Sequence, residues 1–177
     1  MFKFVVAVVF LSGTYQFCNC DVHSATVRLY DPTGNTEVTG ELNFTQVENG
    51  VRITGEIHGI HEGKHGGHVH VDADISKGCI GAGGPFNPHN VRHAGPDDEI
   101  RNTGDLGNVV GDRFGVAHID VVDKRIKLNK GIDGIIGRGF VIHEKEDDLG
   151  RGNNAESGKT GNSGGRIACG VIKVLEE

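Results

Sequence analysis

The chain of 177 residues lacks several patterns that would point to common protein classes. It has no sustained helical period after residue 20, no internal repeat, no heptad pattern, no phosphate-binding glycine loop and no nucleophile-elbow motif. Basic residues are also scarce, with 18 Lys and Arg against 24 Asp and Glu, for a formal net charge of −6. The acidic balance argues against nucleic acid and anionic membranes as partners.

No apolar run in the chain is long enough to cross a bilayer. Residues 4–11 form a short apolar run after Lys3, and small and polar residues lead from it to Cys20. This layout is typical of a secretory signal. We therefore expect a signal peptide over residues 1–20 and one secreted domain over residues 21–177, with no membrane span.

The cysteines support an extracellular location. Cleavage after residue 20 would remove Cys18 and Cys20 and leave Cys79 and Cys169. Paired cysteines persist as disulfides in oxidising compartments. We therefore expect one disulfide between Cys79 and Cys169.

Secretion also gives meaning to the sequence Asn43-Phe44-Thr45, which is an acceptor for N-linked glycosylation. Many such sequences stay unmodified in secreted proteins. Both the glycosylated and the unmodified state of Asn43 therefore remain open.

Short alternating runs rich in Val and Ile, separated by Gly, Asn and Asp, predict an all-β fold. Eight strands are expected, which suggests a sandwich or barrel. The predicted strands cover residues 26–30, 41–46, 51–57, 67–71, 116–121, 125–128, 140–143 and 170–175.

Two long segments carry no strand pattern, at residues 72–105 and 144–165. Both are rich in Gly and polar residues. Cys79 lies in the first segment and Cys169 follows the second, so the disulfide would tie the first loop to the scaffold. Long loops in compact domains are often functional, and we expect these two to shape a site.

Histidines supply the strongest chemical signal. Five of the ten histidines fall between residues 58 and 70, ending in the pair His68-Val69-His70. Side chains alternate along a strand, so His68 and His70 point to the same side and can offer two imidazoles to one metal ion. A third ligand must come from elsewhere in the chain.

Several sequence blocks resemble the signatures of the copper/zinc superoxide dismutase family, in order and at the expected spacing. The resemblance implies an eight-stranded Greek-key β-barrel with two long loops, copper ligands at His68, His70 and His143, and a homodimer or higher homo-oligomer. The matching blocks are His65-Gly-Gly-His68-Val-His70, Gly104-Asp-Leu-Gly-Asn108, Ile136-Gly-Arg138, Val141-Ile-His-Glu-Lys-Glu-Asp-Asp-Leu-Gly150, Lys159-Thr-Gly-Asn162 and Gly165-Arg-Ile-Ala-Cys-Gly170.

The zinc half of the family's site is incomplete here. Pro85 stands where the family has the histidine that bridges copper and zinc, and Asn102 replaces a second zinc histidine. His93 and Asp105 match the two remaining zinc ligands. Structural zinc requires a closed tetrahedral shell, so we expect zinc to be weakly bound or absent. Because the bridging histidine is missing, we also expect dismutase activity to be weak or lost.

Some of the residues that guide the substrate in the family are present in this chain. Arg166 matches the arginine that guides superoxide, and Lys159 and Thr160 match the rim of the electrostatic loop. Arg166 either guides an anion or only hydrogen-bonds the loop near Cys79. The resemblance also implies that Asp147 orients His70 and His93.

Four further histidines have open roles. His89 either replaces a lost zinc ligand beside His93 and Asp105, or is a solvated loop side chain. His58 and His61 either chelate metal together with His65, or are solvated.

We therefore predict a secreted copper-binding relative of the superoxide dismutases, resembling the haemolymph plasma proteins of bivalve molluscs of the cavortin and pernin type. The first alternative is an active extracellular copper dismutase acting on superoxide. The second is a recognition module that uses the fold as a scaffold.

Overall fold

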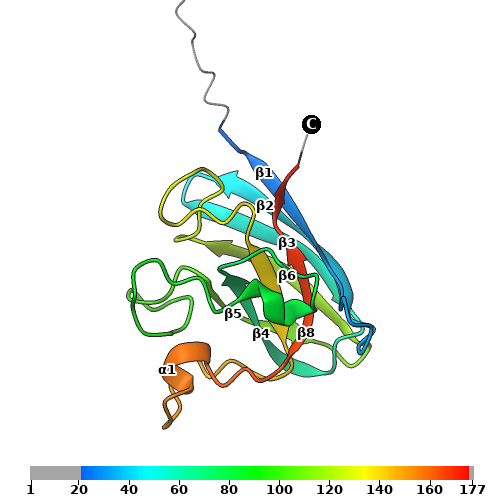
Figure 1. Ribbon diagram of the computed structural model, residues 1–177. Coiled ribbons are helices and arrows are strands. Elements are labelled where there is room, and N and C mark those ends of the chain that lie inside the picture. Colours follow the sequence, from blue (N-terminus) through cyan, green and yellow to red (C-terminus); the bar gives the residue numbers. More distant parts are fainter. Residues whose placement is uncertain (1–20, 176–177) are drawn as a thin grey trace, which may run out of the picture.

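The computed structural model describes residues 21–175, so the predicted signal peptide lies outside the described residues. Two antiparallel sheets make up the domain (Figure 1). The first sheet has the order β6 (Val116–Asp123), β3 (Gly50–His58), β2 (Thr39–Val47), β1 (Ser24–Leu29) and β9 (Lys173–Val174). The second has the order β5 (Asp105–Gly111), β4 (Gly63–His70), β7 (Gly139–His143) and β8 (Arg166–Val171).

The alternating side chains of these strands build the core between the sheets. On β2, Leu42 and Phe44 are fully buried while their neighbour Asn43 is exposed. Phe44 meets Phe140 of β7 edge to face, with 6.1 Å between ring centroids. Removal of this apolar surface from water is the main force that holds the sheets together.

The two sheets also meet at their edges. Tyr30 and Cys169 exchange two backbone hydrogen bonds, N to O, of 3.1 and 2.9 Å, which join the end of β1 to β8. At the other edge a tight turn connects β5 to β6, closed by the Asp112 N–H donating to the Val116 carbonyl at 2.8 Å. The chain passes from the first sheet to the second after β3. In the first sheet β3 pairs with the later strand β6, and in the second sheet β4 pairs with the later strand β7. This arrangement confirms the expected all-β fold and is consistent with a Greek-key barrel.

The strand predictions differ from the structure in three places. Strand β5 was missed because Gly107 and Asn108 interrupt the apolar alternation, although its backbone pairs with β4 regardless of side chain. Residues 125–128 form no strand; Ile126 and Leu128 are buried in the core, and Lys127 makes only an isolated bridge to Gly134. The predicted strand at 170–175 is divided between β8 and β9.

Both long loops are ordered and lie over the second sheet. The first contains the short 3₁₀ helix η1 (Cys79–Ala82), and the second contains α1 (Ser157–Thr160), which lies at the end of the barrel away from the start of β1 (Figure 1). The predicted disulfide is confirmed: Cys79 is bonded to Cys169, with 5.5 Å between their Cα atoms. The disulfide fixes the first loop to β8. Among the described residues, no helix is long and apolar enough to cross a membrane.

Candidate metal centre

Strands β4 and β7 place three histidines on one face of the second sheet. Val69 of β4 and Phe140 of β7 are neighbours in the pairing, and both point into the core. Because side chains alternate, His68 and His70 must point to the opposite face. His143 ends β7 on that same face, and the two loops cover it, so all three histidines are at most 5% exposed.

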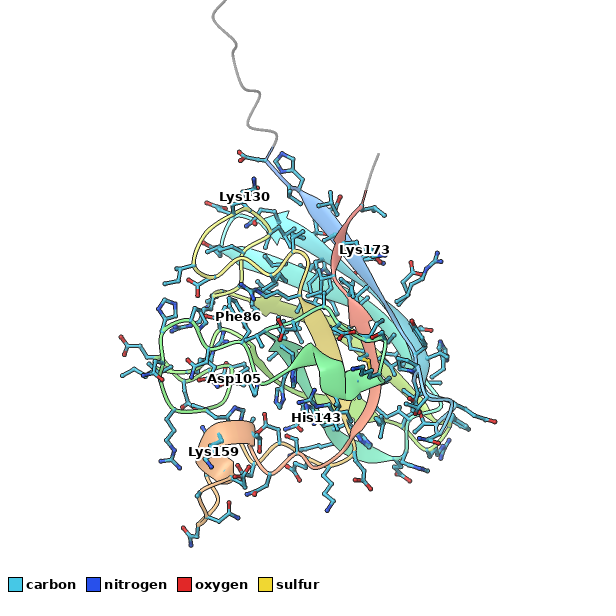
Figure 2. The ribbon with its side chains drawn as sticks, viewed as in Figure 1. Phe86, Asp105, Lys130, His143, Lys159 and Lys173 are labelled. Atoms are coloured by element: carbon cyan, nitrogen blue, oxygen red, sulfur yellow. A yellow bond between two sulfur atoms is a disulfide. The ribbon has the colours of Figure 1, made fainter. Side chains whose placement is uncertain are left out.

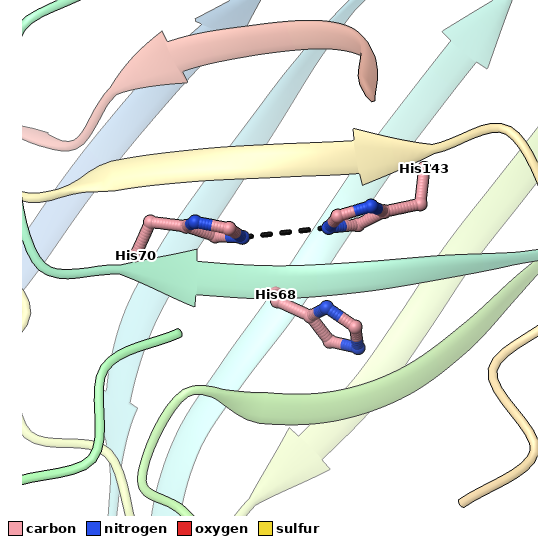
Figure 3. Close-up of side chains that lie close together, drawn as sticks. All are labelled: His68, His70 and His143. Atoms are coloured by element: carbon pink, nitrogen blue, oxygen red, sulfur yellow. Dashed lines mark hydrogen bonds between the residues drawn. The ribbon is translucent and has the colours of Figure 1, made fainter. Parts of the chain in front are cut away.

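The three imidazoles converge, as Figure 3 shows. The Nε2 atoms of His70 and His143 are 3.4 Å apart. The ring centroid of His68 lies 4.8 Å from that of His143 and 6.3 Å from that of His70. One nitrogen from each ring lies within 4.8 Å of the other two, a spacing that suits a single metal ion.

Hydrogen bonds select which nitrogen of each ring is free. His70 Nδ1 lies 2.9 Å from the Gly83 carbonyl, and His143 Nδ1 lies 3.3 Å from the Gly164 carbonyl, so both rings donate from Nδ1 and leave Nε2 free. His68 uses the opposite nitrogen and donates from Nε2 to Asp147 Oδ2 at 2.8 Å. Its Nδ1 is buried and has no hydrogen-bond partner. A buried polar atom without a partner is costly, and a metal ion would satisfy it.

Burial keeps two of the rings in the form that binds metal. It lowers the pKa of His70 from 6.5 to about 2, despite the hydrogen bond to the Gly83 carbonyl. Burial, reinforced by the neighbouring His68, lowers the pKa of His143 to about 3. Neutral imidazoles carry the free lone pair that a metal requires.

A cavity of about 310 Å³ opens onto the three histidines and is also lined by Pro85 and Arg166. The proline ring has no donor atom for a metal. Arg166 donates to the Cys79 carbonyl at 2.7 Å and to the Gly83 carbonyl at 2.6 Å. The Arg166 guanidinium therefore hydrogen-bonds the first loop near Cys79, which was one of the two roles expected for it. The guanidinium also borders the cavity. Thr160 lines the cavity too, whereas Lys159 pairs with Glu156 at 3.2 Å.

Asp147 connects the three-histidine centre to the other half of the site. Its Oδ2 accepts from His68 and its Oδ1 lies 2.8 Å from His93 Nε2. The expectation that Asp147 orients His70 was therefore wrong, since His70 is oriented by the Gly83 carbonyl instead. Burial alone would raise the pKa of Asp147, but the hydrogen bonds from His68 and His93 outweigh it and hold the pKa below its usual range.

The zinc half of the site is filled by contacts among its own residues. Asp105 Oδ2 accepts the backbone N–H groups of Ala94 at 3.1 Å and Asn102 at 3.0 Å, and its Oδ1 accepts from Asn102 Nδ2 at 3.2 Å. His93 Nδ1 lies 2.8 Å from Asp105 Oδ1 but is not aligned for a hydrogen bond. One imidazole and one carboxylate do not complete the four-ligand shell of structural zinc.

His93 lies between two carboxylates. Burial alone would lower the pKa of His93, but Asp105 and Asp147 outweigh this effect and raise it to about 9. A protonated imidazole cannot act as a metal ligand, so a metal ion bound at His93 would have to displace a proton.

The other histidines do not join these groups. His89 Nε2 contacts Asp133 Oδ1 at 2.8 Å, and no group of metal-binding side chains in the described residues combines His89 with His93. His65 is buried, with its two ring nitrogens on the carbonyls of His143 at 2.9 Å and His61 at 3.1 Å. A shared chelating site of His58, His61 and His65 is therefore not formed.

Several supporting groups were not predicted from the sequence. Gly83 and Gly164 act through their carbonyls, which no side-chain pattern reveals. Asn108 exchanges hydrogen bonds with the backbone of Asp147, at 2.9 Å to its carbonyl and 2.8 Å from its N–H. Gly161 lies so close to Asp147 and His93 that a Cβ there would fall 1.8 Å from Asp147 Oδ1. In Figure 2, which has the view of Figure 1, Asp105, His143 and Lys159 of α1 all appear in the lower half of the molecule.

Comparisons with known proteins agree with this geometry. Residues 38–172 match the family model described as copper/zinc superoxide dismutase (SODC). An extracellular superoxide dismutase [Cu-Zn] of Drosophila melanogaster is 50% identical over 142 residues, covering 79% of this chain and 78% of the relative. The corresponding protein of Brugia pahangi is 47% identical over 154 residues, covering 85% of this chain and 76% of the relative.

Among solved structures, the crystal structure of the clock protein EA4 superposes with a TM-score of 0.82 at 46% identity. The match covers 88% of this chain and 96% of that one. With the strand order, the histidine centre and these matches in agreement, the chain belongs to the copper/zinc superoxide dismutase family.

Proposed function

We propose that this protein is an extracellular copper-binding member of its family in which dismutation of superoxide is slow or absent. The observation that carries the proposal is Pro85, which lines the cavity beside the three histidines. At this position the family pattern has a histidine, whose imidazole would supply copper with a further nitrogen ligand and the site with a proton donor; proline can supply neither. The protein would then be closer in function to the metal-binding bivalve plasma proteins than to a fast dismutase.

The donor atoms support copper at the three-histidine centre. His68 Nδ1, His70 Nε2 and His143 Nε2 would hold the ion, while Asp147 and two loop carbonyls fix the ring orientations. A bound copper ion would supply one-electron redox chemistry to the site. The chain itself offers no protonated donor at Pro85, so protons would have to come from water.

The residues in the zinc half of the site argue against zinc as a resident ion. Asp105 already accepts three N–H groups, and Asn102 places an amide where the family has an imidazole. We therefore propose that zinc is weakly bound or absent.

The names of the relatives support an extracellular location, since those from Drosophila melanogaster and Brugia pahangi are both called extracellular. The disulfide agrees with an oxidising compartment. We propose that residues 1–20 are removed on secretion and that the exposed Asn43 is available for glycosylation. Assembly as a homodimer or higher homo-oligomer remains part of the proposal.

The test combines metal content with activity. After loosely bound metal is removed with a weak chelator, the purified protein should retain about one copper per chain, and His143→Ala should abolish this retained copper while the exposed His61→Ala does not. The copper-loaded protein should dismutate superoxide far more slowly than a complete copper/zinc enzyme in the same assay. Pro85→His should raise the rate, and Pro85→Ala should not, which separates the imidazole from the loss of the proline ring.

A second candidate function is dismutation by copper alone. Arg166 favours it, because its guanidinium borders the cavity and would attract a small anion. Rapid turnover by the copper-loaded protein, lowered by Arg166→Leu, would establish this candidate and overturn the first. Failure to bind copper would overturn both.

A further inference from the structure

Three side chains that carry donor atoms for a metal lie close together on the outer face of the first sheet. It consists of Glu56 and His58 on β3 and His118 on β6, and we call it the surface histidine cluster. Glu56 and His118 stand directly opposite each other in the pairing of the two strands, and His58 follows Glu56 by two residues. All three side chains therefore point to the same face of the sheet.

One carboxylate contacts both imidazoles. Glu56 Oε1 lies 3.0 Å from His118 Nδ1, and Glu56 Oε2 lies 3.4 Å from His58 Nε2. The side chains of Glu56, His58 and His118 are 50%, 54% and 69% exposed. Such exposed pairs contribute little to folding, so the fold does not depend on this arrangement.

The three side chains are free to close around an ion. Imidazole nitrogen binds zinc at about 2.0–2.1 Å and carboxylate oxygen at about 2.0–2.2 Å, so two ligands of one tetrahedral ion lie about 3.4 Å apart, close to the present contacts of Glu56. Exposed side chains change rotamer on the picosecond to nanosecond timescale, so both rings can turn toward one ion held by Glu56. Two imidazoles with a carboxylate form a donor set that prefers divalent transition-metal ions over Ca²⁺ or Mg²⁺.

The surroundings favour a cation. Glu41 of β2 is paired opposite Glu56 and brings a second carboxylate to the same face. Glu41 contacts Arg28 at 3.1 Å, but Arg28 is 83% exposed and can move away.

We propose that Glu56, His58 and His118 bind one divalent transition-metal ion, such as Zn²⁺, at a site separate from the three-histidine centre. The two sites lie on different sheets: the cluster is on the outer face of β3 and β6, while the buried histidines lie on β4 and β7. The surface site exchanges metal directly with solvent, whereas the buried centre is covered by two loops. The full-length folded protein would therefore carry one rapidly exchanging metal site and one protected site.

The test is a Zn²⁺ titration of the metal-free protein followed by calorimetry. Wild-type protein should show a class of sites with micromolar affinity that His58→Ala and His118→Ala each weaken by about tenfold or more, because each removes one of three ligands. Glu56→Gln should weaken the same class, and the matched exposed variant His61→Ala should leave it unchanged. Addition of paramagnetic Ni²⁺ should broaden the ring NMR signals of His58 and His118 before that of His61.

Two results would overturn the proposal. One is a His58→Ala/His118→Ala double variant that keeps the wild-type stoichiometry and affinity for Zn²⁺. The other is an equal loss in His61→Ala, which would indicate diffuse binding by surface histidines. Copper binding by the buried centre is measured separately in the same variants. If the buried centre bound no copper, the proposed function would be contradicted, but the proposal for the surface site would not be affected.

Discussion

Pro85 and His70 are paired in an isolated antiparallel β-bridge. The hydrogen bonds around this bridge come from neighbours, with Val71 N–H donating to the Gly84 carbonyl at 3.0 Å and Phe86 N–H donating to the Val69 carbonyl at 2.9 Å. Proline has no N–H, but none is needed at this position. The loop therefore keeps its path along β4 while the side chain that faces the metal centre offers no ligand.

Asp147→Asn should weaken copper binding without unfolding the protein. Both carboxylate oxygens accept from imidazoles, and an amide can accept on only one side, so either His68 or His93 would lose its partner. Loss of such a supporting hydrogen bond typically lowers metal affinity by about 10–100-fold. Copper affinity measured by competition with a chelator checks this, with the exposed Asp97→Asn as control. Equal affinities in the two variants would contradict the role assigned to Asp147.

Gly161→Ala should destabilise the second loop severely. A Cβ at Gly161 would lie 1.8 Å from Asp147 Oδ1 and 2.6 Å from His93 Nε2, at a backbone φ of +63°. Gly137 is a matched control because its φ is +79° and nothing lies within 4 Å of its Cβ position. Gly137→Ala should cost only the backbone strain, about 1–2 kcal/mol. Chemical unfolding should show a clearly larger loss for Gly161→Ala, and similar losses would refute the steric argument.

Removal of the disulfide should lower stability and loosen the loop that carries Pro85. The bond joins residues 90 positions apart, and a loop of that length corresponds to about 4–5 kcal/mol in the chain-entropy model. Arg166 also donates to the Cys79 carbonyl, so the arginine should lose its fixed position. Thermal unfolding of Cys79→Ala/Cys169→Ala against wild type measures the first effect. Amide hydrogen exchange over residues 79–83 measures the second, and unchanged exchange would contradict it.

The metal-free protein should lose stability as the pH falls below 6.5. Burial lowers the pKa values of His70 and His143 to about 2 and about 3, whereas both ionise near 6.5 once unfolded. The unfolded chain then binds more protons, and stability falls by up to about 1.4 kcal/mol per pH unit for each residue. Urea unfolding in the presence of EDTA from about pH 7 to pH 4 measures the slope. The variant His70→Gln/His143→Gln should have a shallower slope, and an unchanged slope would count against the burial effect.

Deprotonation of His93 should lower the stability of the metal-free protein at high pH. Burial favours its neutral form, but Asp105 and Asp147 prevail and raise its pKa to about 9. The contribution of charged His93 to the free energy of unfolding is therefore complete below pH 6.5 and is lost as the pH rises through 9. Unfolding of the metal-free protein from about pH 7 to pH 10 should show this loss, and His93→Gln should remove it. A loss of the same size in that variant would assign it to another group.

The sequence alone predicted the all-β class from alternation, the disulfide from the cysteine count, and the pair His68 and His70 from their strand spacing, whereas the third histidine, His143, came from the resemblance to the family. It failed at β5, where pairing by backbone hydrogen bonds does not require an apolar pattern. It also failed on the partner of Asp147, since the choice between His68 and His70 depends on which ring nitrogen faces the loop.

The residue types establish which donor groups a metal could use, and comparison with the family pattern shows that Pro85 and Asn102 each remove one of them. The folded chain then sets which nitrogen of each ring stays free, which groups are buried enough to change pKa, and that Glu56, His58 and His118 meet on one face. The reason is physical: residue identity sets what chemistry a side chain can perform, whereas strand pairing and loop packing set the distances and the dielectric in which it acts.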